Sequence, residues 1–131
     1  MTENLNRTPL SYMQTYPVDE AAFEAFPLPP DSIIAGDPKT EVATLHQTES
    51  GSVLAGVSRF TEGTYRYTQT ADEINYVTRG RMTITSDKDD QKIECTPGSV
   101  TRLDKGVTYT KAITEPYEEI FVMFDGDGVQ M

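Results

Sequence analysis

Short runs of alternating apolar and polar residues dominate this chain from residue 31 onward. Each run is rich in β-branched or aromatic residues and stops at a cluster of Gly, Pro, Asp or Ser, a pattern typical of β-strands separated by turns. No segment shows a convincing long helical period. About ten short strands at this spacing predict an all-β sandwich or barrel. The expected strands are residues 32–35, 41–48, 53–60, 65–69, 73–78, 81–85, 92–95, 99–103, 108–113 and 119–124.

Residues 1–30 have a different character, being polar and Pro-rich with no sustained period. We expect an N-terminal arm here, followed by one domain over residues 31–131. Residues 18–26 are predicted to form one or two helical turns, because Pro27, Pro29 and Pro30 would end a helix at that point.

Composition narrows the function classes. The chain has 131 residues with 11 basic against 21 acidic side chains, a net charge of −10. Such a surface repels phosphate backbones and anionic membranes, so neither nucleic acid nor membrane is expected as a partner. There is no apolar run long enough to span a bilayer and no basic-then-apolar leader, which predicts a cytoplasmic protein. A lone Cys95 excludes an intrachain disulfide and is expected to be a buried apolar residue.

Two sequence frames stand in order along the predicted strands. The first contains Gly63, an aromatic-Arg-aromatic triplet at residues 65–67, Glu73 and Gly80; the second runs from Pro97-Gly98 to Tyr109. Together they resemble the two motifs of the cupin superfamily, and most closely small cupins related to ureidoglycine aminohydrolase and the ethanolamine-utilisation cupin. The resemblance covers roughly residues 36–125. It implies a cupin barrel, a double-stranded β-helix or jelly roll, with an N-terminal arm.

The metal ligands of the resembled family are missing from this sequence. In metal-containing cupins the first motif places two His before the Glu, and the second ends in a third His. The matching positions here are Tyr67, Gln69 and Tyr109, and only Glu73 is kept. One carboxylate with an amide and two phenols is a poor donor set for a transition metal. We therefore expect no metal and no other cofactor.

Strand alternation sorts the motif residues into faces. Tyr65, Tyr67 and Gln69 share one face of their strand, and Glu73, Asn75 and Val77 share one face of the next. In the second motif Tyr109, Lys111 and Ile113 share a face. If Glu73 points into the barrel, as the cupin frame implies, Ile74 and Tyr76 point outward. An apolar outer face on a barrel predicts contact with another subunit, so a homodimer is expected.

Glu73 is the centre of the predicted site. A carboxyl ringed by phenols inside a barrel suits general acid–base work, with Tyr67 and Tyr109 as catalytic partners, on a small-molecule substrate or ligand. Two alternatives stay open: a non-catalytic binding cupin, and a Glu73 that is purely structural because it pairs with Lys111, Arg102 or Arg79. The residues predicted to contact the ligand are Tyr65, Gln69, Asn75, Arg102, Lys111 and His46.

Overall fold

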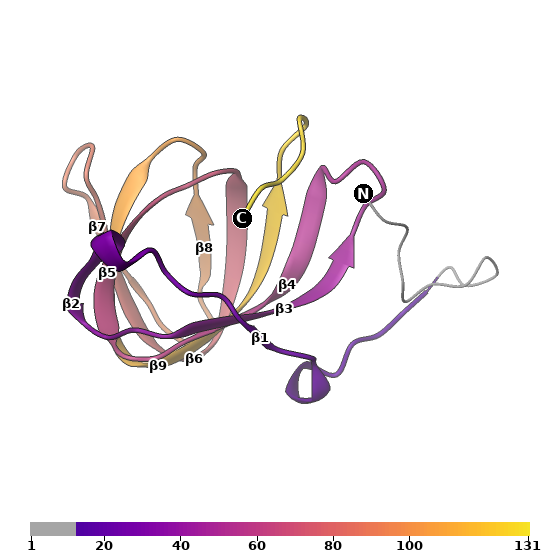
Figure 1. Ribbon diagram of the computed structural model, residues 1–131, viewed down its shortest axis with the longest axis horizontal. Coiled ribbons are helices and arrows are strands. Elements are labelled where there is room, and N and C mark those ends of the chain that lie inside the picture. The colour runs from indigo at the N-terminus through magenta and orange to yellow at the C-terminus, as the bar shows by residue number, and fades with distance from the viewer. Residues whose placement is uncertain (1–12) are drawn as a thin grey trace.

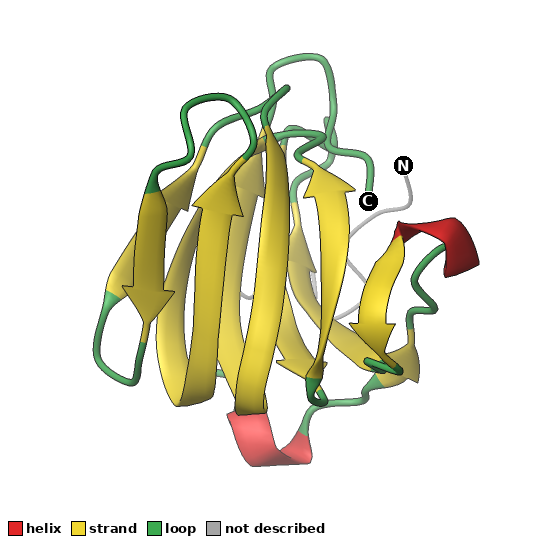
Figure 2. Ribbon diagram, turned by 90° about the vertical axis from the view of Figure 1, so that its left-hand side faces the viewer, coloured by secondary structure: helices red, strands yellow, loops and turns green. Residues whose placement is uncertain are grey.

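The computed structural model describes residues 13–131 of the chain, and it is built almost entirely of strands that curl into a barrel (Figures 1 and 2). Residues 1–12, which belong to the predicted arm, lie outside the described residues. The elements are η1 (Val18–Glu20), β1 (Glu24–Ala25), η2 (Pro30–Ser32), β2 (Ile33–Gly36), β3 (Thr40–Gln47), β4 (Val53–Phe60), β5 (Gly63–Thr68), β6 (Asp72–Ser86), β7 (Lys92–Cys95), β8 (Val100–Leu103) and β9 (Thr108–Phe124).

Two long strands, β6 and β9, hold the barrel together. β9 pairs with β4 and β5 on one side and with β6 along the other, and β6 also pairs with β8 through its first half and with β7 through its second. All of these pairings are antiparallel. Each long strand therefore belongs to both halves of the curled sheet, and side chains from distant parts of one strand meet in the interior.

The sequence predicted one strand on each side of Gly80 and two separate strands within residues 108–124, and both predicted breaks were wrong. Residues 72–86 and 108–124 are continuous strands. Gly80 does have a left-handed φ of 83°, but it sits where the register of β6 against β9 shifts, next to Pro116, rather than in a turn. Gly80 therefore bends a single strand, β6, between its first and second halves. This is the role of a β-bulge, and not that of a hairpin turn between two strands.

Alternation predicted the inward and outward faces correctly. Glu73, Asn75 and Val77 are buried, whereas Ile74 and Tyr76 on the same strand are exposed. Cys95 is buried, as expected for an apolar residue. The interior has two apolar clusters. One contains Phe60, Tyr65, Val77, Met82, Ile84, Cys95, Leu103, Tyr109, Ile113 and Tyr117; the other contains Val42, Leu54, Ala71, Phe121 and Met123.

The described part of the arm packs along the edge of the barrel. Residues 18–20 form a single 3-10 turn, shorter than the one or two helical turns predicted, and the chain then pairs as β1 with β3. Backbone hydrogen bonds to β3 replace those of a longer helix, including one from Phe26 N to Thr40 O of 2.8 Å. Asp19 pairs with Arg79 at 3.1 Å, and the Phe23 ring lies 4.0 Å from the Arg59 guanidinium. No helix among the described residues is long and apolar enough to cross a membrane.

Candidate functional site

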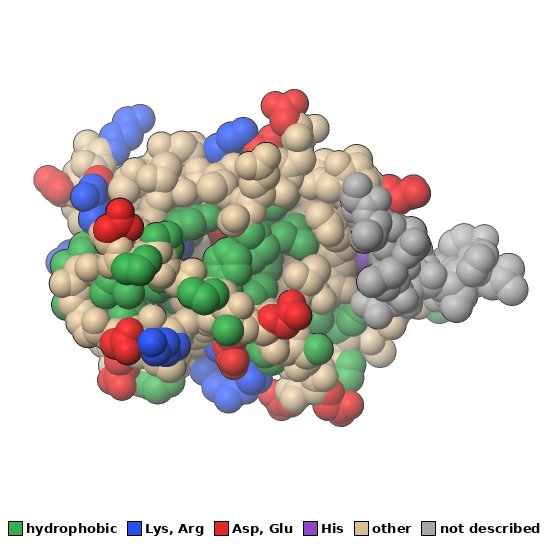
Figure 3. All heavy atoms as spheres, viewed as in Figure 1, with side chains coloured by type: hydrophobic (Ala, Val, Ile, Leu, Met, Phe, Trp, Pro, Cys, Tyr) green, Lys and Arg blue, Asp and Glu red, His purple; other side chains and the backbone are tan. Residues whose placement is uncertain are grey.

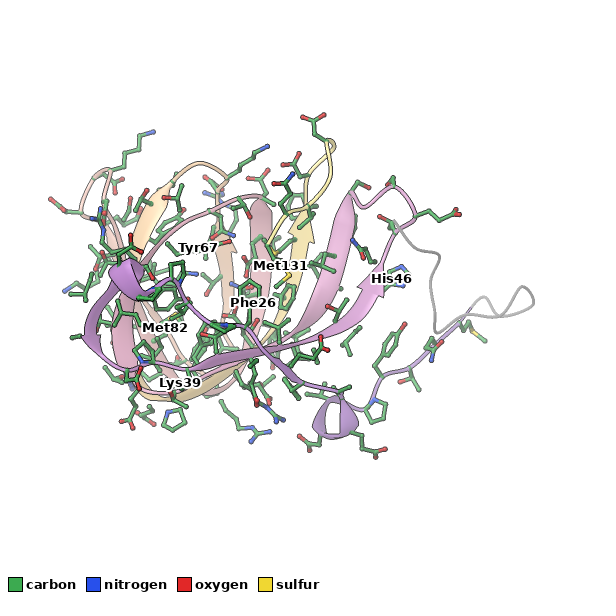
Figure 4. The ribbon with its side chains drawn as sticks, in the orientation of Figure 1. Phe26, Lys39, His46, Tyr67, Met82 and Met131 are labelled. Atoms are coloured by element: carbon green, nitrogen blue, oxygen red, sulfur yellow. The ribbon has the colours of Figure 1, made fainter. Side chains whose placement is uncertain are left out.

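A small cavity lies inside the barrel between the two apolar clusters. Its volume is about 60 Å³, which is room for about four water-sized groups. Phe26 from the arm and Met131 from the C-terminal segment lie near Tyr67 at its mouth (Figure 4), and hydrophobic side chains gather in the middle of this face of the molecule (Figure 3). The lining residues are Phe26, Leu28, Thr40, Val42, Ser58, Phe60, Tyr65, Tyr67, Glu73, Lys111, Glu119, Phe121, Met123 and Met131.

Glu73 reaches the cavity from the first half of β6 and is 7% exposed. The Gln69 side-chain amide donates a hydrogen bond of 2.6 Å to its Oε1. Gln69 follows β5 directly and is fixed by its own backbone, which donates to Val107 O and accepts from Gly106 N. The amide oxygen Oε1 of Gln69 has no hydrogen-bond partner among the described residues. Gln69 thus orients the Glu73 carboxyl without lining the cavity itself.

A second carboxyl, which the sequence analysis did not select, shares this cavity. Glu119 lies in the second half of β9 and is 5% exposed. Burial first, and then repulsion from Glu73, raises its pKa to about 8, although Lys111 acts in the opposite direction. Glu119, Phe121 and Met123 alternate along β9, so the strand period alone would have placed Glu119 inside beside two core residues.

Lys111, in the first half of β9, is the only lysine among the residues that line the cavity. Its ammonium lies 5.1 Å from the centre of the Tyr67 ring and 6.0 Å from that of Tyr65, within reach of cation–π attraction. Burial lowers the pKa of Lys111, but its Tyr65, Glu73 and Glu119 neighbours together raise it. Burial also raises the pKa of the Tyr65 hydroxyl to about 12. Lys111 is therefore a cation rather than an amine nucleophile.

Five predicted site residues do not line this cavity: Gln69 reaches it only through its hydrogen bond to Glu73, and the other four lie elsewhere. Arg102 lies on the outer face of β8, opposite Ile74, and pairs with Asp104 at 3.1 Å. Tyr109 is buried in the core, where its hydroxyl accepts a hydrogen bond from Asp104 N. Asn75 is buried beyond the cavity lining. His46 lies on β3, away from Tyr67 and Phe26 (Figure 4).

The alternative partners of Glu73 can also be placed. Arg79 pairs with Asp19 and with Glu118, each at 3.1 Å, and Arg102 pairs with Asp104. Neither arginine is among the cavity residues. Lys111 is the cation that shares the cavity with Glu73. The electrostatics of the site therefore involve one ammonium and two carboxyls.

The residues present do not fit a cupin metal. Tyr67 and Tyr109, at two of the family's His positions, point to different surroundings, and Gln69, at the third, donates its amide to Glu73. Within residues 13–131 no three His, Cys, Asp or Glu side chains come together as a metal set. A transition metal needs several converging nitrogen, sulfur or carboxylate donors.

A comparison with models of known protein families finds one family that matches this chain. The model described as "Ethanolamine utilisation protein EutQ" matches residues 30–129. The chain belongs to the EutQ family. No curated protein matches it, so the EutQ assignment comes from the family model.

Solved structures agree with the fold of this EutQ-family protein. The Clostridium difficile EutQ protein has a TM-score of 0.61 at 24% identity, over 69% of this chain and 71% of that one. A Thermotoga maritima protein described as a predicted oxalate decarboxylase has a TM-score of 0.66 at 15% identity, covering 85% and 98%. A cupin superfamily protein from Desulfitobacterium hafniense has a TM-score of 0.55 at 18% identity, covering 65% and 76%. The predicted cupin barrel is confirmed. These identities are too low to carry an activity.

Proposed function

We propose that this EutQ-family protein is a metal-independent enzyme that performs acid–base chemistry on a small metabolite inside the barrel. The observation that supports this best is the pair of buried carboxyls, Glu73 and Glu119, facing one cavity. Two carboxyls in different environments can divide the roles of acid and base. Glu119, whose pKa is raised to about 8, is the proposed proton donor. Glu73, oriented by Gln69, is the proposed base.

The remaining polar groups suit a substrate that develops negative charge on oxygen. Lys111 and the tyrosines 65 and 67 line the same cavity, and an ammonium or phenol can stabilise an oxyanion as it forms. The reaction types in keeping with this set are isomerisation, cyclisation, elimination and hydrolysis. All four need a proton removed at one position and supplied at another, which is what two carboxyls can do.

A non-catalytic, small-molecule-binding role is the second candidate. The observation that favours it is the hydrogen bond from Gln69 to Glu73, which occupies one oxygen of the carboxyl that the enzymatic proposal uses as a base. In that case the cavity recognises a ligand, and the protein serves as an accessory to a pathway.

The test begins with the ligand that co-purifies with the protein, identified by native mass spectrometry and then by a structure of the complex. Glu73→Gln keeps the shape of the side chain and removes its proton site. We expect the variant to fold and bind normally while turnover falls about 100-fold or more, the size of one acid–base group. The exposed Glu94→Gln is the matched control. Unchanged turnover in Glu73→Gln would assign Glu73 a structural role.

The assembly is part of the proposal. We propose a cytoplasmic homodimer that joins through the outer face of β6, β8 and β9, where Ile74, Tyr76, Val100, Val122 and Phe124 are exposed. Tyr76 is the register partner of Val100, and Ile74 that of Val122, so these side chains form one continuous surface. A contiguous apolar face of this kind supports a subunit contact.

A further inference from the structure

Tyr117 carries a buried hydroxyl that has no hydrogen-bond partner among the described residues. The side chain is 2% exposed, and its ring packs against that of Phe60, with the ring centres 5.9 Å apart. The ring is therefore held in place while its polar end stays unpaired. Buried tyrosine hydroxyls usually find a partner, and an unpaired one lowers stability, a cost that a phenylalanine at this position would avoid.

Glu119 is the carboxyl beside this hydroxyl. It lies two residues after Tyr117 in β9, and both side chains are buried on the inward face of the strand, where residues two apart are neighbours. Ser58 and Phe60, their register partners on β4, line the cavity together with Glu119. Burial first, and then Glu119, raises the pKa of the Tyr117 hydroxyl, and the hydroxyl in turn lowers the pKa of Glu119. An unpaired donor therefore lies against the proposed proton donor of the site.

The other ionisable groups around Glu119 come from four strands. Lys111 of β9 favours the ionised form of Glu119, whereas Glu73 of β6 opposes it. Tyr65 of β5 and Cys95 of β7 stay neutral, because burial raises the pKa of each. An ionised Glu119 would share the Lys111 ammonium with Glu73, so a further hydrogen-bond donor would stabilise it.

We infer that Tyr117 is a positioning residue for Glu119: its hydroxyl donates a hydrogen bond to the Glu119 carboxylate once that carboxyl has released its proton. This inference rests on the proposed function only in making Glu119 the proton donor. Tyr117 is not among the residues that line the inner cavity, so it acts on a substrate through Glu119. Because the unpaired hydroxyl destabilises the protonated state and its hydrogen bond stabilises the ionised one, release of the proton becomes easier. No proton leaves Tyr117, whose pKa is raised above its ordinary value.

The titration of the Glu119 carboxyl tests the inference. NMR of protein labelled at the glutamate Cδ carbon follows this carboxyl through the neutral and alkaline range, and Glu119→Gln identifies its signal. The pKa of about 8 in the parent should rise by about one pH unit or more in Tyr117→Phe, the size of one hydrogen bond to a charged group. An unchanged Glu119 titration in Tyr117→Phe would overturn the inference.

Tyr109→Phe is the matched control. Tyr109 is also a buried tyrosine of β9, but its hydroxyl already accepts a hydrogen bond from Asp104 N. Tyr109→Phe should lose stability and leave the Glu119 titration as in the parent. Below the pKa of Glu119, Tyr117→Phe should be at least as stable as the parent, because it removes an unpaired hydroxyl. An equal shift of Glu119 in both variants, or a clear loss of stability in Tyr117→Phe at that pH, would overturn the inference.

The parent protein supplies a second measurement, which does not depend on the folding of Tyr117→Phe. The NMR signal of the Tyr117 Cζ carbon should shift with the same midpoint as Glu119, because the hydroxyl gains an acceptor there, and it should stay constant in Glu119→Gln. A constant signal in the parent would overturn the inference.

Turnover of the co-purified ligand separates this inference from the proposed function. With Glu119 as the proton donor, Tyr117→Phe should lower turnover several-fold at neutral pH, leave ligand affinity unchanged and move the alkaline limit of activity upward with the Glu119 pKa. If the Glu119 titration moves in Tyr117→Phe while turnover and its pH profile do not, Tyr117 positions Glu119 as inferred, and the role of Glu119 in the proposed function is wrong.

Discussion

Gln69 donates a 2.6 Å hydrogen bond to Glu73, and both side chains are buried. Gln69 occupies a position where metal-containing cupins place a histidine. In those cupins the side chain at this position binds the metal, whereas in this protein it orients a carboxyl. A glutamine in place of the histidine keeps the side chain pointing inward, but it supplies a hydrogen-bond donor instead of a metal ligand. The Glu73 carboxyl of this EutQ-family barrel is consequently held by a neighbouring side chain of the same chain.

The first prediction concerns that hydrogen bond. Gln69→Met keeps the length of the side chain and leaves the Glu73 carboxyl without its donor. We expect a loss of about 1–3 kcal/mol in the free energy of unfolding, the usual cost of an unsatisfied buried partner, measured by urea denaturation. Gln91→Met, at an exposed position, should change stability by less than about 0.5 kcal/mol. Equal stability of the two variants would contradict the prediction.

The second prediction is a pH dependence that originates in Glu119. Its pKa is raised from 4.5 to about 8 in the folded protein, so between these values the folded state holds a proton that the unfolded state has lost. Stability from this group therefore falls as the pH rises from about 4.5 to 8 and is lowest above 8. Relative to the parent, Glu119→Gln should gain stability between pH 5 and pH 8 in chemical denaturation.

The size and the control of this effect can be stated separately. Each pKa unit corresponds to about 1.4 kcal/mol, so the relative gain of Glu119→Gln should amount to a few kcal/mol. The exposed Glu94→Gln should show no comparable trend. A constant stability difference between Glu119→Gln and the parent from pH 5 to pH 8 would mean that Glu119 ionises normally.

The third prediction compares two glycines with similar backbone conformations. Gly80 and Gly106 have φ of 83° and 86°, but a Cβ at Gly80 would lie 2.0 Å from Pro116 O, whereas nothing lies within 4 Å of a Cβ at Gly106. Gly106→Ala should cost about 1–2 kcal/mol from backbone strain. Gly80→Ala should cost clearly more, because β6 and β9 must also move apart. Thermal unfolding measures both, and equal costs would refute the close approach.

The fourth prediction is the oligomeric state. Light scattering at micromolar concentration should give about twice the chain mass of 14.6 kDa. Tyr76→Asp places a charge in the proposed subunit contact and should shift the protein to monomer. Ile34→Asp, at an exposed apolar residue on β2 outside that surface, should leave the dimer intact. A monomeric parent protein, or dissociation by both variants, would reject this face as the contact.

The fifth prediction concerns metal content. Because Tyr67, Gln69 and Tyr109 occupy the histidine positions, elemental analysis of protein purified without chelator should give well under one transition metal per chain. Iron, zinc, manganese and nickel are the elements to measure. Occupancy close to one for any of them would refute the prediction, and Glu73 and Glu119, the two carboxyls of the cavity, would then be the ligands to mutate first.

Much of the fold could be predicted from the sequence, because apolar and polar residues alternate along a strand that has one buried face. Alternation along residues 73–77 correctly placed Glu73, Asn75 and Val77 inside and Ile74 and Tyr76 outside. Turn residues delimited strands β4 (Val53–Phe60) and β7 (Lys92–Cys95) at the bounds that the structure has. The two motif frames then indicated a cupin barrel. Local backbone preference and one buried face were enough for the strands and their faces, whereas the cupin barrel was implied by the family resemblance.

The tertiary structure decided which inward residues meet. Tyr109 and Lys111 share a face of β9, yet only Lys111 lines the cavity. Lys111 and Glu119, on opposite halves of that strand, both face Glu73's cavity because β9 bends with β6 near Gly80. The strand period specifies a side, inside or outside, but contains no information about how far a strand bends. The meeting of two carboxyls and one ammonium therefore depends on the curvature of the closed barrel, which pairing between distant strands imposes.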